Sequence, residues 1–238
     1  MSESYKNKLK DEHVLVLQDV YKIYKLGQSE VIALDNVTLN VNKGDFISIM
    51  GPSGSGKTTL LNIMGALDLP TKGKVFINNL DLEKLDDSEL TKLRRNEIGF
   101  IFQFFNLIPV LSCYENIELP LIISGIKKND RDKRINEILE KVELGRYRKH
   151  KPNELSGGQQ QRVAIARALV NKPSIVLADE LTGDLDSHTG EIIMDYLETL
   201  NRSENQTIVV VTHDIKVAKR TNQIYQIEDG KLVSKLKN

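Results

Sequence analysis

The sequence predicts an α/β fold, and three patterns indicate it. From residue 45 onward, short apolar segments alternate with amphipathic helices, which favours a mainly parallel, doubly wound sheet. Before that point, apolar and polar residues alternate over 14–20 and 31–41, which predicts antiparallel strands. Between residues 104 and 155, three prolines and a charged helix replace the strand patterns. We therefore expect an α/β core with an antiparallel β subdomain and an inserted α-helical subdomain.

These elements make one domain over residues 1–238, with residues 1–103 and 156–238 as the core and residues 104–155 as the insert. In the insert, Ile135, Ile138, Leu139 and Val142 are spaced as one apolar helix face. Near the C-terminus, the Asp229-Gly230 pair between two β-like segments predicts a hairpin. The strands expected in the core are 45–50, 74–79, 98–103, 174–179 and 207–214.

The composition excludes several classes of function. Lys+Arg 33 balance Asp+Glu 33, so the chain lacks the positive field of a nonspecific nucleic-acid binder, and we expect no nucleic-acid partner. The single cysteine, Cys113, cannot form an internal disulfide, which fits a reducing compartment. The polar N-terminus does not resemble a secretory signal, and no apolar run approaches the roughly 20 residues that span a bilayer. Any work at a membrane would require docking onto another chain.

One glycine-rich segment, "GPSGSGKT", matches the phosphate-binding pattern G-x-x-x-x-G-K-[ST] and lies between an expected strand and an expected helix. Its glycines allow backbone N–H groups to surround phosphate oxygens, while Lys57 reaches the terminal phosphates and Thr58 can ligate Mg²⁺. The sequence therefore predicts a nucleoside triphosphate site and a P-loop NTPase core. The residues expected around the phosphates are Gly51, Pro52, Ser53, Gly54, Ser55, Gly56, Lys57, Thr58 and Thr59.

The segment "IVLADE" is an apolar strand that ends in two acids, Asp179 and Glu180. Alone, two acids at a strand end are consistent with a cap or a turn. Beside a phosphate loop, the pattern is that of a Walker B segment, in which the first carboxylate holds Mg²⁺ and the second orients or deprotonates the attacking water. We expect these two roles for Asp179 and Glu180.

The segment "LSGGQ" narrows the choice among phosphate-loop families. Ser156 is a candidate helix N-cap, and Gly157 and Gly158 would expose backbone N–H groups at a helix start, so the segment predicts a second anion site. Together with Gln159, these residues form the signature sequence of the ATP-binding cassette (ABC) ATPases, which the chain resembles over roughly residues 14–235. The resemblance implies a homodimer that buries two Mg-ATP, with each signature completing the ATP site of the other copy.

The resemblance also assigns four further residues. Gln103 matches the Q-loop glutamine, which helps to ligate Mg²⁺, and His213 matches the H-loop histidine that contacts the γ-phosphate. Tyr24 matches the aromatic residue that stacks on adenine, with Tyr21 or a purely structural tyrosine as the alternatives. Asp186 matches the D-loop acid that faces the partner copy. The expected catalytic residues are Glu180, His213, Lys57 and Gln103, and the expected metal ligands are Thr58, Gln103 and Asp179.

Longer segments such as "TKLRRNEIGFIFQFFNLIP" resemble the subfamily that powers macrolide export, lipoprotein release and antimicrobial-peptide resistance. This implies a membrane permease docked at the helical subdomain, and a cytoplasmic protein that is peripheral on the inner face of the cell membrane. Apolar residues that could either form this docking surface or pack internally are Phe104, Phe105, Leu107, Ile108 and Leu111.

Two residues depart from the family pattern. Leu181 stands where the family usually has proline, and Asp184 where it usually has asparagine or alanine. The loss of proline frees φ at residue 181 and restores an N–H group, which could loosen the strand exit that aims Glu180. Neither change removes a reacting group, so we expect ATPase activity to be retained.

Three other functions compete with the transporter ATPase. A cell-division ABC ATPase would signal to a membrane partner without moving a solute, and the sequence separates it poorly from the transporters. A soluble ABC ATPase acting on nucleic acid or in translation would carry a coiled coil or a second cassette, and this chain shows neither pattern. A small-molecule phosphotransferase would need an acceptor pocket and a lid, and "LSGGQ" argues against it.

Overall fold

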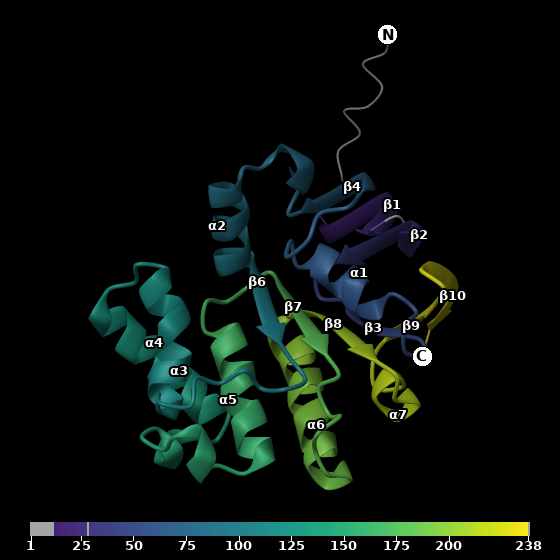
Figure 1. The fold of residues 1–238 in the computed structure, drawn as a ribbon. Helices are drawn as coiled ribbons and strands as arrows, with labels where there is room; N and C mark the ends of the chain where they lie inside the picture. Colours follow the sequence, from purple (N-terminus) through teal and green to yellow (C-terminus); the bar gives the residue numbers. More distant parts are fainter. Residues whose placement is uncertain (1–11, 28, 238) are drawn as a thin grey trace.

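The computed structural model describes residues 12–27 and 29–237, and two sheets share its core (Figure 1). The larger sheet has the strand order β10-β9-β3-β8-β7-β6. Neighbouring strands in it are parallel except for the antiparallel hairpin β9-β10, so the predicted mainly parallel sheet is confirmed. Its strands are β3 (Phe46–Met50), β6 (Ile98–Ile101), β7 (Ile175–Asp179), β8 (Thr207–Thr212), β9 (Gln223–Glu228) and β10 (Lys231–Lys237).

The smaller sheet is antiparallel, as the alternating N-terminal pattern predicts, and has the order β2-β1-β4-β5. Its strands are β1 (His13–Leu26), β2 (Ser29–Asn42), β4 (Lys72–Ile77) and β5 (Leu80–Asp81). Helix α1 (Lys57–Met64) packs its apolar side chains into a core shared with β1, β2, β7 and β8. Both sheets therefore brace the helix that follows the phosphate loop.

A second core joins the helices to the other face of the large sheet. The four apolar residues predicted on one helix face, Ile135, Ile138, Leu139 and Val142, are all buried there. Figure 1 shows this helical part beside the sheet. Its helices are α3 (Cys113–Ile123), α4 (Lys128–Lys141), α5 (Gly157–Leu169) and α6 (Ser187–Glu204), with short 3-10 turns η3 (Gly145–Tyr147) and η4 (Pro152–Glu154). A further 3-10 turn, η2 (Leu82–Lys84), follows β5.

Several elements differ from the sequence prediction. The strand expected over 98–103 ends at Ile101, which leaves Gln103 outside the sheet. Helices α2 (Asp87–Glu97) and α7 (Ile215–Ala218) have no counterpart in the prediction. Helix α2 buries only Leu90 and Leu93, so its apolar pattern is weak, and a capping box between Asp86 and Glu89 starts it instead.

The polar N-terminal segment 1–11, predicted to lack a secretory signal, lies outside the described residues. Among the residues that are described, no helix combines the length and apolar character that crossing a bilayer requires.

Candidate functional site

The glycine-rich segment forms the turn between β3 and α1, as predicted. A side chain at Gly51 would place its Cβ 2.2 Å from the backbone oxygen of Ile227, and one at Gly56 would place it 2.5 Å from that of Ala33. Gly56 also has a φ of 102°, which L side chains rarely adopt. The segment therefore depends on glycine to bring its backbone close to neighbouring strands. It lines one side of a cleft of about 750 Å³.

Two polar groups in this turn suit a phosphate ligand. The ammonium of Lys57 donates to the carbonyls of Gly51 and Pro52, each at 2.8 Å, and so lies across the turn. Ser55 is 3% exposed, and its Oγ has no hydrogen-bond partner among the described residues. A buried hydroxyl without a partner is costly unless a ligand satisfies it. Both groups fit the expected role of the turn in binding triphosphate.

The ends of β7 and β8 bring Glu180 and His213 together in the same cleft. Glu180 Oε1 lies 2.8 Å from His213 Nδ1, and Thr212 Oγ1 donates to Glu180 Oε2 at 3.2 Å. Glu180 has a φ of 45°, in the left-handed region that non-glycine residues seldom occupy. Its N–H donates to the carbonyl of Val211 at 2.9 Å, which holds the strand exit in place. Two of the four predicted catalytic residues, Glu180 and His213, are therefore in direct contact.

Asp179 precedes Glu180 and is the last residue of β7. Burial raises the pKa of the Asp179 carboxyl, the nearby carboxylate of Glu180 raises it further, and Lys57 opposes both effects. A cation at this position would relieve the cost of holding the Asp179 charge. Thr58 and Gln103 line the same cleft, so a carboxylate, a hydroxyl and an amide oxygen are available. Such oxygen donors, completed by phosphate oxygens, fit Mg²⁺.

The four acids of "DELTGDLD" do not form one metal cluster. Among the described residues, no group of three or more His, Cys, Asp or Glu side chains could hold a metal ion. Asp186 instead caps helix α6, where its carboxylate accepts bonds from the Thr189 N–H at 3.0 Å and from the Thr189 hydroxyl at 2.6 Å. These bonds lower the pKa of the Asp186 carboxyl. Asp186 thus has a structural role within its own chain beside the predicted role towards a partner.

Tyr24 lies on β1, next to the cleft and not among its lining residues. Its hydroxyl donates to Asp68 at 2.9 Å, and the ammonium of Lys22 lies 4.9 Å from its ring centroid. Val31, its pairing partner on β2, is 46% exposed, and Ile32 is 57% exposed. Val31 and Ile32 were not assigned to the nucleotide site from the sequence. Two adjacent apolar residues near the start of β2 are the pattern that could have indicated them. The cleft is lined there by Val31, Ile32 and Ala33.

The signature segment begins helix α5, as predicted. Ser156 caps the helix by accepting from the Gln159 N–H at 3.3 Å, while Gln159 Oε1 accepts from the Ser156 N–H at 2.9 Å. Ser156, Gly158 and Gln159 line a second cleft of about 740 Å³. This cleft shares no lining residue with the cleft at the phosphate loop. Within one chain, the two predicted anion sites are separate.

Leu181, the departure at the strand exit, has a structural explanation. Its side chain is 2% exposed and packs in the second core with residues of α5 and α6. Gln161 of α5 donates to its carbonyl at 3.0 Å. Leu181 is therefore anchored at the strand exit both by its buried side chain and by its carbonyl.

The chain is similar to known proteins of one family. A model of the ABC transporter family matches residues 34–183. The ABC transporter ATP-binding protein MJ0796 of Methanocaldococcus jannaschii is 56% identical over 223 residues, which cover 92% of this chain and 95% of that protein. The macrolide export ATP-binding/permease protein MacB of Hyphomonas neptunium is 46% identical over 221 residues, which cover 93% of this chain and 34% of that protein.

A solved structure of MJ0796, described as a dimeric post-hydrolysis state bound to ADP and Pi, superposes with a TM-score of 0.86 at 54% identity. The match covers 94% of this chain and 98% of that one. One conclusion follows from the sequence matches and the shared fold, together with the phosphate loop that lines the same cleft as Asp179 and Glu180. This chain belongs to the ABC transporter family and is its ATP-binding, ATP-hydrolysing domain.

Proposed function

We propose that two copies of this domain close around two Mg-ATP, each phosphate loop facing the signature of the other copy. The observation that carries the proposal is the separation of the two clefts, which leaves Ser156 and Gly158 outside the cleft of their own Lys57. An ATP bound in one chain would therefore lack signature donors until a second chain supplies them. A twofold dimer supplies both at once, and solved structures of MJ0796 are described as dimeric.

In this proposal, the residues of the cleft have separate roles in ATP hydrolysis. Lys57 and the backbone of the phosphate loop would bind the phosphates, and Thr58, Asp179 and Gln103 would hold Mg²⁺. Bound Mg²⁺ supplies positive charge that offsets the charge developing on the phosphate oxygens. Glu180 takes a proton from the attacking water, since its carboxylate lies within the cleft beside His213.

His213 holds the Glu180 carboxylate in place, with Thr212 as the second anchor. In the ATP-bound state, His213 is expected to turn its other ring nitrogen towards the γ-phosphate, because its side chain is largely exposed to the cleft. Tyr24 is proposed to stack on adenine beside Val31 and Ile32, which would provide an apolar floor for the base.

A complementation experiment tests the shared site. The variants Lys57→Ala and Ser156→Arg are each expected to lose ATPase activity, since each homodimer lacks one half of both sites. In a mixture, the phosphate loop of the Ser156→Arg chain meets the intact signature of the Lys57→Ala chain. Equal mixing should restore up to about a quarter of wild-type activity if sites act independently, because half of the dimers carry one intact site. A mixture as inactive as either variant alone would contradict the shared site.

We further propose that a membrane permease docks on exposed apolar residues that follow α1, precede α3 and end α3, here called the patch. Its members are strongly exposed for apolar side chains: Leu67 49%, Phe104 71%, Val110 73%, Ile122 49% and Ile123 57%. Exposed apolar surface of this kind is typical of sites that a partner covers. Leu107, by contrast, is partly buried against the second core, so only part of the predicted docking segment is available.

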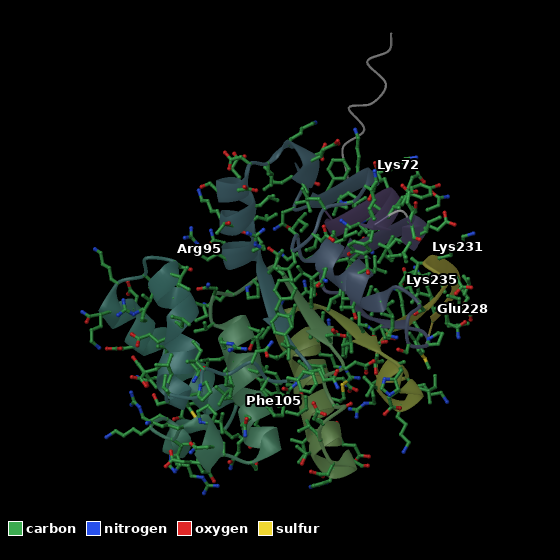
Figure 2. The ribbon with its side chains drawn as sticks, viewed as in Figure 1. Lys72, Arg95, Phe105, Glu228, Lys231 and Lys235 are labelled. Atoms are coloured by element: carbon green, nitrogen blue, oxygen red, sulfur yellow. The ribbon has the colours of Figure 1, made fainter. Side chains whose placement is uncertain are left out.

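Two arginines at the end of α2 join the parts of this patch. Arg94 donates to the carbonyl of Ala66 at 2.9 Å, and Arg95 donates to that of Ile123 at 3.1 Å. Arg95 and Phe105 are labelled in Figure 2. Because Arg167 holds the carbonyl of Phe105 at 2.8 Å, the segment after Gln103 is fixed to α5. A force on the patch would thus reach both the Q-loop residue and the signature helix.

A substitution on the patch tests the docking. Val110→Ser should leave basal ATPase activity unchanged and should abolish recovery of the protein with membranes when the permease is co-expressed. Val233→Ser is the matched control, since Val233 is 52% exposed on β10, far along the chain from the patch. Equal recovery of the two variants with membranes would contradict the proposed patch.

The permease proposed here is of the macrolide-export, lipoprotein-release or antimicrobial-peptide-resistance type, because MacB proteins are among the similar chains and combine a permease with such a domain. The whole chain then acts as one nucleotide-binding domain, located in the cytoplasm and held at the membrane only through its permease. A neighbouring gene for a four-span permease with a large external domain would support this assignment. A neighbouring gene for a recombination or ribosome factor would count against it.

A further inference from the structure

A buried glutamine connects the signature helix to the strand exit that carries Glu180. Gln161 lies on α5, five residues beyond Ser156, and is 0% exposed. Its Nε2 donates to the carbonyl of Leu181 at 3.0 Å, across 20 residues of sequence. Leu181 directly follows Glu180, so the hydrogen bond fixes the backbone one residue beyond the proposed base.

The rest of this loop is held against the same helix. A side chain at Gly158 would place its Cβ 2.4 Å from Thr189 Cγ2, so the signature turn packs directly on the first turn of α6. Asp186 caps that turn through Thr189. The segment from Leu181 to Asp186 is therefore held at one end by Gln161 and at the other by the signature turn itself.

Stability alone does not explain an amide at position 161. Gln161 Oε1 is buried and has no hydrogen-bond partner among the described residues. A buried polar atom without a partner is unfavourable, so the cost at Oε1 offsets part of what the bond from Nε2 to the Leu181 carbonyl contributes to stability. The amide supplies one thing that an apolar side chain cannot, namely the bond to the Leu181 carbonyl.

The backbone of Glu180, which directly precedes Leu181, has a conformation that its surroundings must hold in place. Glu180 has a φ of 45°, and its carbonyl accepts from the Gly183 N–H at 3.0 Å. A residue held in the left-handed region relaxes to a commoner conformation when its surroundings are released. A change of this kind would swing the Glu180 carboxylate away from the position at which it meets water.

We propose that Gln161 is a positioning residue, through which the signature helix sets the place of Glu180. The proposal rests on the dimer described above: the signature of one chain closes on the partner's ATP, and Gln161 transmits that closure to the base acting on the chain's own ATP. Binding of one nucleotide and hydrolysis of the other are thereby coupled within each chain. Gln161 itself touches neither ATP nor the reacting atoms.

The test compares Gln161→Met with Gln160→Met. Gln160 is the matched control, because it is a half-buried glutamine on the same helix whose Nε2 bonds to Leu155, within the signature segment itself. For Gln161→Met, kcat should fall by about tenfold to a hundredfold, the range expected when a reacting group is misplaced by an ångström or less. KM for ATP should stay within about twofold, since binding is unaffected. Gln160→Met should stay within about twofold of wild type in both constants.

Two further measurements keep the result interpretable. Thermal unfolding establishes that the variants fold, with Gln161→Leu as a second substitution. The double variant Gln161→Met with Glu180→Gln should still form the Mg-ATP-dependent dimer, which separates loss of positioning from loss of assembly. If Glu180→Gln alone stays monomeric with Mg-ATP, the dimer proposal fails, while the split between kcat and KM still reports on Gln161.

Three outcomes would overturn the positioning role. The first is an unchanged kcat in a folded Gln161 variant. The second is an equal loss of kcat in Gln160→Met. The third is failure of both Gln161 variants to fold, which would assign the amide to stability.

Discussion

Replacement of Asp179 by asparagine should stabilise the free protein and abolish its stabilisation by Mg-ATP. In the structure, burial and the neighbouring carboxylate of Glu180 both raise the pKa of the Asp179 carboxyl, and Lys57 offsets only part of this. At neutral pH, the folded protein therefore carries a charge that its surroundings disfavour. Asparagine keeps the shape and removes the charge. Since cleft water screens the interaction, we expect a gain of about 1 kcal/mol, typical of a relieved active-site carboxylate.

The gain corresponds to a rise in Tm of roughly 2–4 °C for a chain of this size. Its pH dependence follows from the direction of the shift. Because the folded pKa is raised, the cost of Asp179 is absent below the unfolded value of about 3.9 and grows as the pH rises through the folded value. Differential scanning calorimetry at pH 7 and pH 4 measures the difference in Tm between Asp179→Asn and wild type. The gain should be present at pH 7 and vanish towards pH 4.

In the same calorimetric scans with Mg-ATP, the substitution Asp179→Asn should be unfavourable instead of favourable. Wild type should gain stability from the bound nucleotide through mass action, whereas Asp179→Asn should gain far less because it lacks the carboxylate ligand. Each protein without nucleotide serves as its own reference, so the two gains can be compared directly. A lower Tm for free Asp179→Asn, or an undiminished gain with Mg-ATP, would refute the reasoning.

Three further predictions concern the surroundings of the site. Leu181→Ala should lower the free energy of unfolding by about 2–5 kcal/mol in urea denaturation, since the side chain is 2% exposed; a loss well below that range would place Leu181 outside the core. Gly158→Ala should lose ATPase activity and keep ATP binding, measured with a fluorescent analogue, because its Cβ would lie 2.4 Å from Thr189 Cγ2; unimpaired turnover would contradict that contact. Cys113 should resist thiol reagents at pH 8, because burial raises its pKa to about 11; rapid labelling of the folded protein would be inconsistent with this.

The sequence predicted the parts of the fold that local patterns determine. Strand β7 is an apolar run that ends in Asp179, strand β8 is mostly apolar and ends directly before His213, and both lie within the predicted ranges. The phosphate loop and the capped start of α5 were also predictable, because each depends on a few residue types at fixed spacing. Helix α2 was not, since it is mostly polar and gains its place from only two buried leucines.

The contacts between distant segments were beyond prediction from the sequence. No pattern in "GGQQQR" indicates that Gln161 is the buried glutamine and Gln160 the half-buried one, since that depends on how α5 packs against the exit of β7. Leu181 was noted only as a departure from a pattern, and its burial in the helical core explains it. The contact of Glu180 with His213 likewise requires the pairing of β7 with β8.

The most direct test of the central claim, that two chains share each ATP site, is the oligomeric state of Glu180→Gln. This variant keeps the size of the side chain and removes the base, so ATP should bind without being hydrolysed. Sedimentation velocity should show a monomer without nucleotide and a dimer with Mg-ATP, and adding Ser156→Arg should return the dimer to monomer. A Glu180→Gln protein that stays monomeric at saturating Mg-ATP would contradict the account.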